Sequence, residues 1–156
     1  MDISELRKLG RTVWLKMKGD CIFCEIIQSR DGKILFENES VIAFAPLKRG
    51  ILSKGHMLVV PKKHYEDIFD IPPEVLSEVS KTAKEIAQTL KDAEELNSVN
   101  ILHASGENAQ QSINHFHLHL VPRTEDDLDL WPETDYEEQD YDKNYAKIRK
   151  KLEQIT

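Results

Sequence analysis

Two periodicities of apolar residues run along this chain, and they separate its helices from its strands. The clearest helix is predicted over residues 71–90, where paired prolines mark the start and apolar side chains recur at helical spacing, at Val75, Leu76, Val79, Ala83, Ile86 and Leu90. Similar spacing predicts an amphipathic helix over residues 2–18 and a last helix over residues 141–155, with Tyr145, Ile148 and Leu152 facing inward. Residues 21–29 are predicted to form a short helix or helical turn.

Short apolar runs between polar breaks predict the strands. These runs lie at residues 33–38, 41–46, 56–60, 98–104 and 113–121. Helices around a run of mostly short strands are typical of the α+β class with an antiparallel sheet. We therefore expect a sheet of about five strands, a long central helix, and further helices toward both ends of the chain.

Length and composition favour one ordinary globular domain. The chain has 156 residues, of which 40% are hydrophobic and 31% are charged. We expect residues 1–20 to form a helical extension and residues 21–156 to form the domain. No segment approaches the run of about 20 apolar residues that a membrane helix needs, and the charged N-terminus does not resemble a secretory signal. The expectation is a cytoplasmic protein that does not engage a membrane.

The net charge of −7 is concentrated in one segment. Residues 124–142 contain ten acidic and no basic side chains, which leaves 21 basic against 18 acidic residues in the rest of the chain. This slightly basic remainder suits a small phosphate-bearing ligand, whereas a protein that binds duplex nucleic acid usually has a strongly basic patch. The acidic segment itself is interpreted as a solvated connection on the surface.

Three histidines, His115, His117 and His119, alternate with apolar residues in the last predicted strand. Side chains alternate between the two faces of a strand, so the three imidazoles are expected on one face, with neighbouring Cα atoms about 7 Å apart. Each buried imidazole needs a hydrogen-bond partner of its own, which argues against a purely structural role for all three. The spacing therefore indicates chemistry.

Two kinds of chemistry fit this spacing. A His-x-His pair can bind one metal ion at a Zn–N distance of about 2.1 Å, but the third histidine would lie too far along the strand to join the same ion easily. Alternatively, one neutral imidazole attacks phosphorus while its neighbours donate hydrogen bonds to the phosphoryl oxygens. With an ordinary pKa of about 6.5, histidine supplies both a neutral nucleophile and a partly protonated donor at about pH 7.

The segment HFHLHLV resembles the signature of the histidine triad (HIT) superfamily, in which three histidines alternate with apolar residues. The segments CIFCEII, ILFENESVIAFAP, KGHMLVVPKKHYEDI and GENAQQSINHFHLHLVPR occur in the order seen in this superfamily, and the resemblance covers residues 21–123. It implies a HIT-like fold. His119 at the third triad position is similar to the hydrolase branch, because the uridylyltransferase branch usually has Gln there.

The resemblance implies a nucleotide hydrolase that acts on nucleoside phosphoramidates or dinucleoside polyphosphates. His117 would attack the α-phosphorus of a purine nucleotide or nucleotide conjugate and form a nucleotidyl-histidine intermediate, which water then hydrolyses. His119 would contact the phosphate and assist the leaving group. His56, Gln111 and Ser112 match further family positions that contact the phosphate or the leaving group. HIT proteins typically dimerise by joining sheet edges, which implies a homodimer.

Cys21 and Cys24 form a C-x-x-C pair, which supplies half of a tetrahedral zinc site. In the zinc-bearing HIT branch that this chain resembles, the other two ligands correspond to His64 and His115, so structural zinc is the implied cofactor and no organic cofactor is expected. His115 would then hold the metal, which requires the strand to bend or to begin near it. A redox pair fits poorly because the preceding residues are polar, and two reduced cysteines packed as small apolar side chains remain the other alternative.

Three positions depart from the family pattern. Ala104 stands where the family usually has Asn, Gln110 stands where Gly is expected, and residues 44–56 lack an acidic ribose contact and are longer than usual. His103 or Ser105 is a candidate to replace the missing amide. Two alternatives to the hydrolase therefore stay open: a nucleotide-binding HIT protein with weak or no catalysis, and a metal-dependent hydrolase that uses the histidines as ligands.

Overall fold

A computed structural model describes residues 21–47, 50–93, 96–123 and 141–155 of the chain. Within them, five strands form one antiparallel sheet in the order β1-β2-β3-β5-β4. The elements are, in chain order, α2 (Ile22–Ser29), β1 (Ile34–Glu37), β2 (Val41–Phe44), β3 (Met57–Pro61), α3 (Pro73–Asp92), β4 (Ser98–Leu102), β5 (Leu118–Arg123) and α4 (Tyr141–Leu152). The predicted α+β class, the five-stranded antiparallel sheet and the long central helix are confirmed. The predicted helix over residues 2–18 and most of the acidic segment lie outside the described residues.

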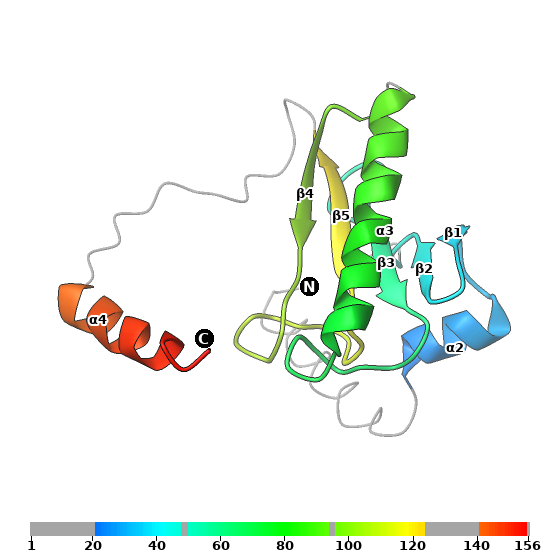
Figure 1. Cartoon of the computed structure of the whole chain (residues 1–156). Coiled ribbons are helices and arrows are strands. Elements are labelled where there is room, and N and C mark those ends of the chain that lie inside the picture. The colour runs from blue at the N-terminus through cyan, green and yellow to red at the C-terminus, as the bar shows by residue number, and fades with distance from the viewer. Residues whose placement is uncertain (1–20, 48–49, 94–95, 124–140, 156) are drawn as a thin grey trace, which may run out of the picture.

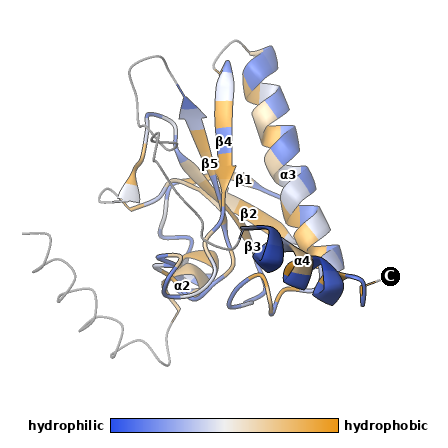
Figure 2. Cartoon of the chain, turned by 90° about the vertical axis from the view of Figure 1, so that its left-hand side faces the viewer, coloured by the Kyte–Doolittle hydropathy of each residue, from blue (hydrophilic) through white to orange (hydrophobic). Residues whose placement is uncertain are grey.

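The two central strands β2 and β3 are buried along their whole length because their side chains enter two different cores. Alternate residues point to opposite faces of a strand. One face packs against α3, with the core residues Val41, Ala43, Val59, Val79 and Ala83, and the other packs against α2, with Ile42, Phe44, Leu58, Val60, Phe23 and Ile26. Figure 1 shows the long helix α3 lying along the sheet, and Figure 2 shows apolar colour gathered on the strands. Each buried Val, Leu, Ile or Phe side chain among them stabilises the fold by about 1.5–3 kcal/mol, so β2 and β3 form a rigid base for the residues that follow them.

The long helix α3 begins where the paired prolines predict. Pro72 is its N-cap in an extended conformation, and Pro73 is its first residue. A proline suits the first helical position because its missing N–H would have no helical partner there. The start of α3 fixes the end of the loop that runs from β3, and this loop carries His64.

The strand that contains the triad begins later than predicted. β5 starts at Leu118, where its pairing with β3 begins, and its pairing with β4 begins one residue later, at His119. The amide of Phe116 donates instead to the carbonyl of Tyr65, at 2.6 Å. The prediction that the three histidines lie in one strand is therefore wrong for His115 and His117, which precede β5. The predicted alternation of faces holds, because Phe116, Leu118 and Leu120 pack in the core that faces α3, while His115 and His117 lie against Phe23 of the other core.

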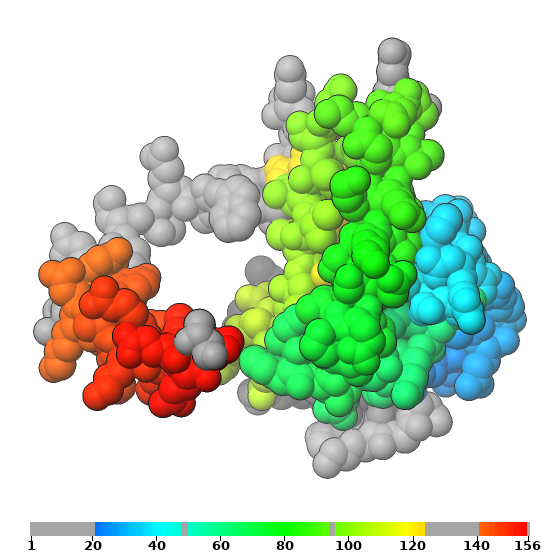
Figure 3. Space-filling model, in the orientation of Figure 1, coloured from blue at the N-terminus to red at the C-terminus, as the bar shows by residue number. Residues whose placement is uncertain are grey.

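The predicted C-terminal helix is confirmed as α4, but its predicted packing is not. Tyr145, Ile148 and Leu152 are 53%, 48% and 53% exposed, and α4 lies to one side of the sheet and α3 (Figure 3). The prediction that these side chains face inward is wrong for the single chain, because no other described element covers them. Among the described residues, no helix combines the length and the apolar composition that crossing a membrane requires.

Candidate functional site

Two groups of polar side chains meet around the connection that leads into β5. The first, which we call the cysteine–histidine cluster, consists of Cys21, Cys24, His64 and His115. The second, which we call the triad cluster, consists of His56, His117 and His119. The buried ring of Phe23 lies between them, with its centroid 5.8 Å from the ring of His115 and 5.2 Å from that of His117. His115 and His117, two residues apart in one segment, therefore belong to two different clusters.

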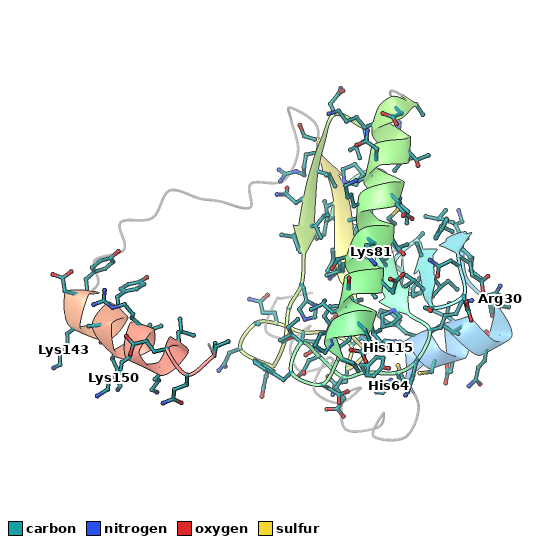
Figure 4. The ribbon with its side chains drawn as sticks, viewed as in Figure 1. Arg30, His64, Lys81, His115, Lys143 and Lys150 are labelled. Atoms are coloured by element: carbon teal, nitrogen blue, oxygen red, sulfur yellow. The ribbon has the colours of Figure 1, made fainter. Side chains whose placement is uncertain are left out.

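In the cysteine–histidine cluster, the donor atoms converge. Cys21 Sγ lies 3.4 Å from His115 Nδ1, and Cys24 Sγ lies 3.6 Å from His115 Nδ1 and 3.5 Å from His64 Nδ1. All four donor atoms lie within 4.8 Å of one another, and Figure 4 shows His64 and His115 close together beside α2. Ligands bound at about 2.1–2.3 Å around a tetrahedral ion are about 3.6 Å apart. The geometry of this cluster therefore fits zinc.

Local structure orients these ligands. Cys21 is the N-cap of α2 and Cys24 lies three residues later, so both sulfurs reach the same side of the helix. His115 Nε2–H donates to the carbonyl of Pro61 at 2.9 Å, which leaves the Nδ1 lone pair directed at the cysteines. A metal-bound histidine usually has such a second hydrogen bond, because it fixes the tautomer and the ring plane.

The protonation chemistry of the cluster also favours a cation. Burial lowers the pKa of His115 to about 4, so the ring is neutral and its lone pair is available at neutral pH. Burial and the neighbouring Cys21 raise the pKa of Cys24 to about 11, because two thiolates repel each other when nothing balances their charge. A bound divalent cation removes that repulsion and stabilises both thiolates.

In the triad cluster, hydrogen bonds select one tautomer for each imidazole. His117 Nδ1 lies 2.7 Å from the carbonyl oxygen of His115. A carbonyl only accepts, so the proton of neutral His117 sits on Nδ1 and its lone pair sits on Nε2. His117 is 3% exposed, and burial lowers its pKa, with a further contribution from His103. His117 is thus a neutral imidazole with one free basic nitrogen.

His56 and His119 form a chain of hydrogen bonds next to His117. The amide of Leu52 donates to His56 Nδ1 at 3.1 Å, so neutral His56 carries its proton on Nε2 and donates it to His119 Nδ1 at 3.0 Å. The proton of His119 then sits on Nε2, and its ring centroid is 4.9 Å from that of His117. The cluster therefore offers a lone pair on His117 beside an N–H donor on His119.

The donors of this cluster are neutral rather than partly protonated. Burial lowers the pKa of His56, and the nearby Gly50 carbonyl offsets only part of that shift. Burial, with smaller contributions from His117, His56 and His103, lowers the pKa of His119 to about 4. The expectation of a partly protonated donor at neutral pH is therefore wrong for the ligand-free protein, because burial favours the uncharged imidazole.

The model of the HIT domain family matches residues 28–126 of this chain. The chain belongs to the HIT family. An uncharacterized HIT-like protein of Methanocaldococcus jannaschii is 40% identical over 108 residues, which cover 69% of this chain and 81% of that protein. The adenosine 5'-monophosphoramidase HNT1 of Saccharomyces cerevisiae is 35% identical over 136 residues, covering 85% and 80%. Among solved structures, a zinc-bound histidine triad family protein of Mycobacterium smegmatis superposes with a TM-score of 0.64 at 27% identity, covering 87% of this chain and 95% of that one.

Gln111 and Ser112, the polar pair before the triad, have different surroundings in this HIT protein. Gln111 is 6% exposed. Its amide nitrogen donates to the carbonyls of Glu66 and Ile113, and its oxygen accepts from the amide of Gly106. Both amide hydrogens are used, so Gln111 has no spare donor for a phosphate and instead fixes the loop before the triad. Ser112 is exposed on that loop.

Two of the three positions that depart from the HIT pattern, Ala104 and Gln110, lie in the same loop, between β4 and β5. Gln110 has a φ of 63°, a left-handed conformation that glycine adopts at little cost, which explains why the family favours Gly there. Both ring nitrogens of His103 bond to protein groups, the carbonyl of His117 and the hydroxyl of Ser105. Neither ring nitrogen is therefore free to replace the amide that Ala104 lacks.

Sequence reasoning missed three groups that orient the histidines of this HIT protein. They are the Pro61 carbonyl, the Leu52 amide and the ring of Phe23. Two of them are main-chain groups, which every residue carries, so no residue pattern reveals them. The third is an ordinary apolar residue of a short helix.

Proposed function

We propose that this HIT protein is a nucleotide hydrolase that acts at the α-phosphorus of its substrate through His117. The observation that carries the proposal is the direction of the His117 ring. Its Nδ1–H is held by the His115 carbonyl at 2.7 Å, which leaves Nε2 as a neutral nucleophile. A nucleophile with a fixed tautomer, next to a hydrogen-bond donor, is the arrangement that covalent catalysis at phosphorus requires.

The proposed reaction has two steps. His117 Nε2 attacks the α-phosphorus of a nucleoside phosphoramidate, and the bond from phosphorus to the leaving nitrogen breaks. The anionic phosphate raises the pKa of His119 on binding, so a proton taken up with the substrate passes from His119 Nε2 to the departing nitrogen. Water then attacks the nucleotidyl-histidine, His117 leaves, and the proton of the water returns to His119. Before the substrate binds, His56 orients neutral His119 through their 3.0 Å hydrogen bond.

Cys21, Cys24, His64 and His115 would hold zinc in this proposal. Bound zinc would supply structure rather than chemistry, because four protein ligands leave no open position for substrate. The four residues tie α2 and the loop after β3 to the connection before β5. Through the carbonyl of His115, they also anchor the group that orients His117.

The family and a named relative support the proposed substrate class. Similarity to an adenosine 5'-monophosphoramidase supports a purine nucleoside phosphoramidate, and dinucleoside polyphosphates are the second class to test. The use of the triad as a metal site receives no support, because the described residues contain one cluster of at least three metal-binding side chains, and His117 and His119 are outside it. A homodimer stays part of the proposal, since β4 is an edge strand on which Ile101 is 47% exposed.

A substrate panel tests the proposal. Adenosine and guanosine phosphoramidates and dinucleoside polyphosphates are incubated with the purified protein, and the products are separated. We expect release of nucleoside monophosphate from at least one phosphoramidate. A rapid acid-free quench followed by mass spectrometry should detect one nucleoside monophosphate on wild-type protein and none on the His117→Ala variant.

Two other outcomes would point elsewhere. Calorimetric binding of nucleotide with no turnover of any substrate would favour the binding module. Turnover that survives His117→Ala but disappears in a chelator would favour a metal-dependent hydrolase. Either result would overturn the proposed covalent mechanism.

A further inference from the structure

A chain of hydrogen bonds outside the triad cluster reaches the backbone of His117. The amide of Ile68 donates to the hydroxyl oxygen of Ser105 at 3.0 Å. Ser105 Oγ lies 2.6 Å from His103 Nε2, and His103 Nδ1 lies 2.8 Å from the main-chain oxygen of His117. The chain thus runs from the loop between β3 and α3 to the backbone of the proposed nucleophile.

The carbonyl of His117 sets the direction of the hydrogen bonds in this chain for the neutral form of His103. The His117 oxygen is a carbonyl and only accepts, so neutral His103 carries its proton on Nδ1. His103 Nε2 is then an acceptor, and Ser105 must donate its hydroxyl hydrogen to it. The Ser105 oxygen remains free to accept from the amide of Ile68. Every donor in the chain meets an acceptor, and one tautomer of His103 satisfies all of them.

The carbonyl of His117 needs this partner because the sheet does not provide one. The ladder between β4 and β5 ends at the pair formed by Leu102 and His119. His103 follows the end of β4 and His117 precedes the start of β5, so neither belongs to the ladder. A main-chain carbonyl of a residue that is 3% exposed is costly to leave without a hydrogen bond. The imidazole of His103 takes the place of the missing backbone donor, and its ring lies against that of Phe116, with centroids 4.3 Å apart.

We propose that His103, held by Ser105, is a positioning residue for the nucleophile His117. This inference rests on the proposed function. His117 is then fixed at both ends, its ring by the carbonyl of His115 and its own carbonyl by His103. His103 acts through the backbone of His117 and does not contact substrate. Small displacements of a reacting group lower the rate of the chemical step much more than they weaken binding of substrate.

Matched substitutions of His103 separate the hydrogen bond from the ring packing. In His103→Asn the side-chain amide nitrogen takes the place of Nδ1, so the donor to His117 is kept and the contact with Phe116 is lost. In His103→Phe the ring contact is kept and the donor is lost. His103→Ala removes both, and Ser105→Ala removes only the group that holds the tautomer.

Steady-state kinetics on one adenosine phosphoramidate, normalised to the folded fraction from thermal melting, test the inference. We expect His103→Phe and His103→Ala to lower kcat about tenfold or more, and to leave KM within about twofold. We expect His103→Asn to keep kcat within about threefold of wild type, and Ser105→Ala to fall between these limits. The His117→Ala variant gives the baseline.

The opposite ranking, in which His103→Phe is active and His103→Asn is not, would overturn the inference. It would show that His103 matters through the packing of its ring and not through its hydrogen bond to His117. Equal activity of His103→Asn and His103→Phe, whether high or low, would overturn it as well. A wild-type protein without turnover on any substrate of the panel would instead overturn the proposed function, and the inference with it.

Discussion

The cysteine–histidine cluster and the triad cluster are built from similar side chains but use them in opposite ways. In the first, donor atoms point at one another, with sulfur to nitrogen distances of 3.4 to 3.6 Å. In the second, His56 accepts from the amide of Leu52 and donates to His119, and His117 donates separately to the carbonyl of His115. The first arrangement surrounds a position where a metal ion would fit. The second leaves the basic Nε2 of His117 available to attack a substrate.

The difference depends on main-chain groups rather than on residue type. His115 donates Nε2–H to the Pro61 carbonyl and turns Nδ1 to the cysteines. His117, two residues later, donates Nδ1–H to the His115 carbonyl and keeps Nε2 free. The same imidazole becomes a candidate ligand or a candidate nucleophile according to which of its nitrogens a carbonyl occupies.

The largest expected effect comes from removing the nucleophile. His117→Ala should lower kcat by about 10³-fold or more, as loss of a covalent nucleophile does in other enzymes, while nucleotide still binds through His56 and His119. Kinetics and calorimetry on one preparation measure both. The control His64→Ala, in the other cluster, should lower the turnover of its folded fraction far less than His117→Ala does. If the activity of His117→Ala stayed within about tenfold of wild type, which corresponds to about 1.4 kcal/mol in the activation barrier, His117 would not be the nucleophile. The proposed functional difference between the clusters would then be wrong.

Disrupting the other cluster should affect stability instead. Purified protein should carry one zinc per chain, and Cys21→Ser should lose it. A metal held at about 100 times its dissociation constant contributes about 2.7 kcal/mol to the free energy of unfolding, so the melting temperature should fall by about 5–10 °C. Metal analysis and thermal melting measure the two effects. Metal-free wild-type protein with the stability of Cys21→Ser would show that the cysteines pack as apolar residues.

Acid should weaken the triad cluster through His119. Its pKa is about 4 in the folded protein and about 6.5 in an unfolded chain, so the unfolded chain binds more protons between these values. The contribution of neutral His119 to the free energy of unfolding is therefore complete above about pH 6.5 and is lost as the pH falls toward about 4. Partial solvent exposure limits the loss to on the order of 1 kcal/mol.

Urea unfolding of wild type and His119→Gln from pH 7 to pH 4 tests this expectation. The wild type should lose more stability than the variant on acidification, because glutamine does not titrate. Protonation of the cysteine–histidine cluster affects both proteins equally and cancels in the difference. Parallel curves would show that His119 is not held neutral by its burial.

A smaller effect is expected from restoring the family amide at Ala104. One neutral hydrogen bond contributes about 0.5–1.5 kcal/mol, so Ala104→Asn should raise kcat/KM on an adenosine phosphoramidate severalfold. Steady-state kinetics of the two proteins measure it. An unchanged or lower kcat/KM would indicate a substrate whose contacts do not need the amide. The loop would then differ from the family in the ligand it binds as well as in its backbone.

The smallest effect concerns the backbone that leads into both clusters. Gln110 has a φ of 63°, so Gln110→Gly should relieve strain and raise the free energy of unfolding by about 0.5 kcal/mol after the entropy cost of glycine. Gly106, with a φ of 87° and open space around it, is the matched control, since Gly106→Ala should lower stability through strain alone. Urea unfolding compares the two. A destabilising Gln110→Gly would show that the Gln110 side chain contributes more than its backbone conformation costs.

Local sequence alone predicts the α+β class, the central helix and the residue types of both clusters. Apolar periodicity predicts the helices and strands because each element buries the face on which its apolar side chains recur. The paired prolines fixed the start of α3 for a similarly local reason. The spacing of the cysteines and the histidines, together with the HIT resemblance, predicts the candidate metal ligands without any structural information.

The start of β5, and with it the cluster that each histidine joins, depends on contacts between distant parts of the chain. The chain leaves the strand before Leu118 because Phe116 bonds to Tyr65 and His115 bonds to Pro61, partners about 50 positions away in sequence. Gln111 likewise reaches Glu66, and α4 keeps Tyr145 and Ile148 exposed although their spacing is that of a packed helix. A hydrogen bond to a distant carbonyl leaves no trace in local periodicity, because every residue has a carbonyl and only folding brings one of them within reach.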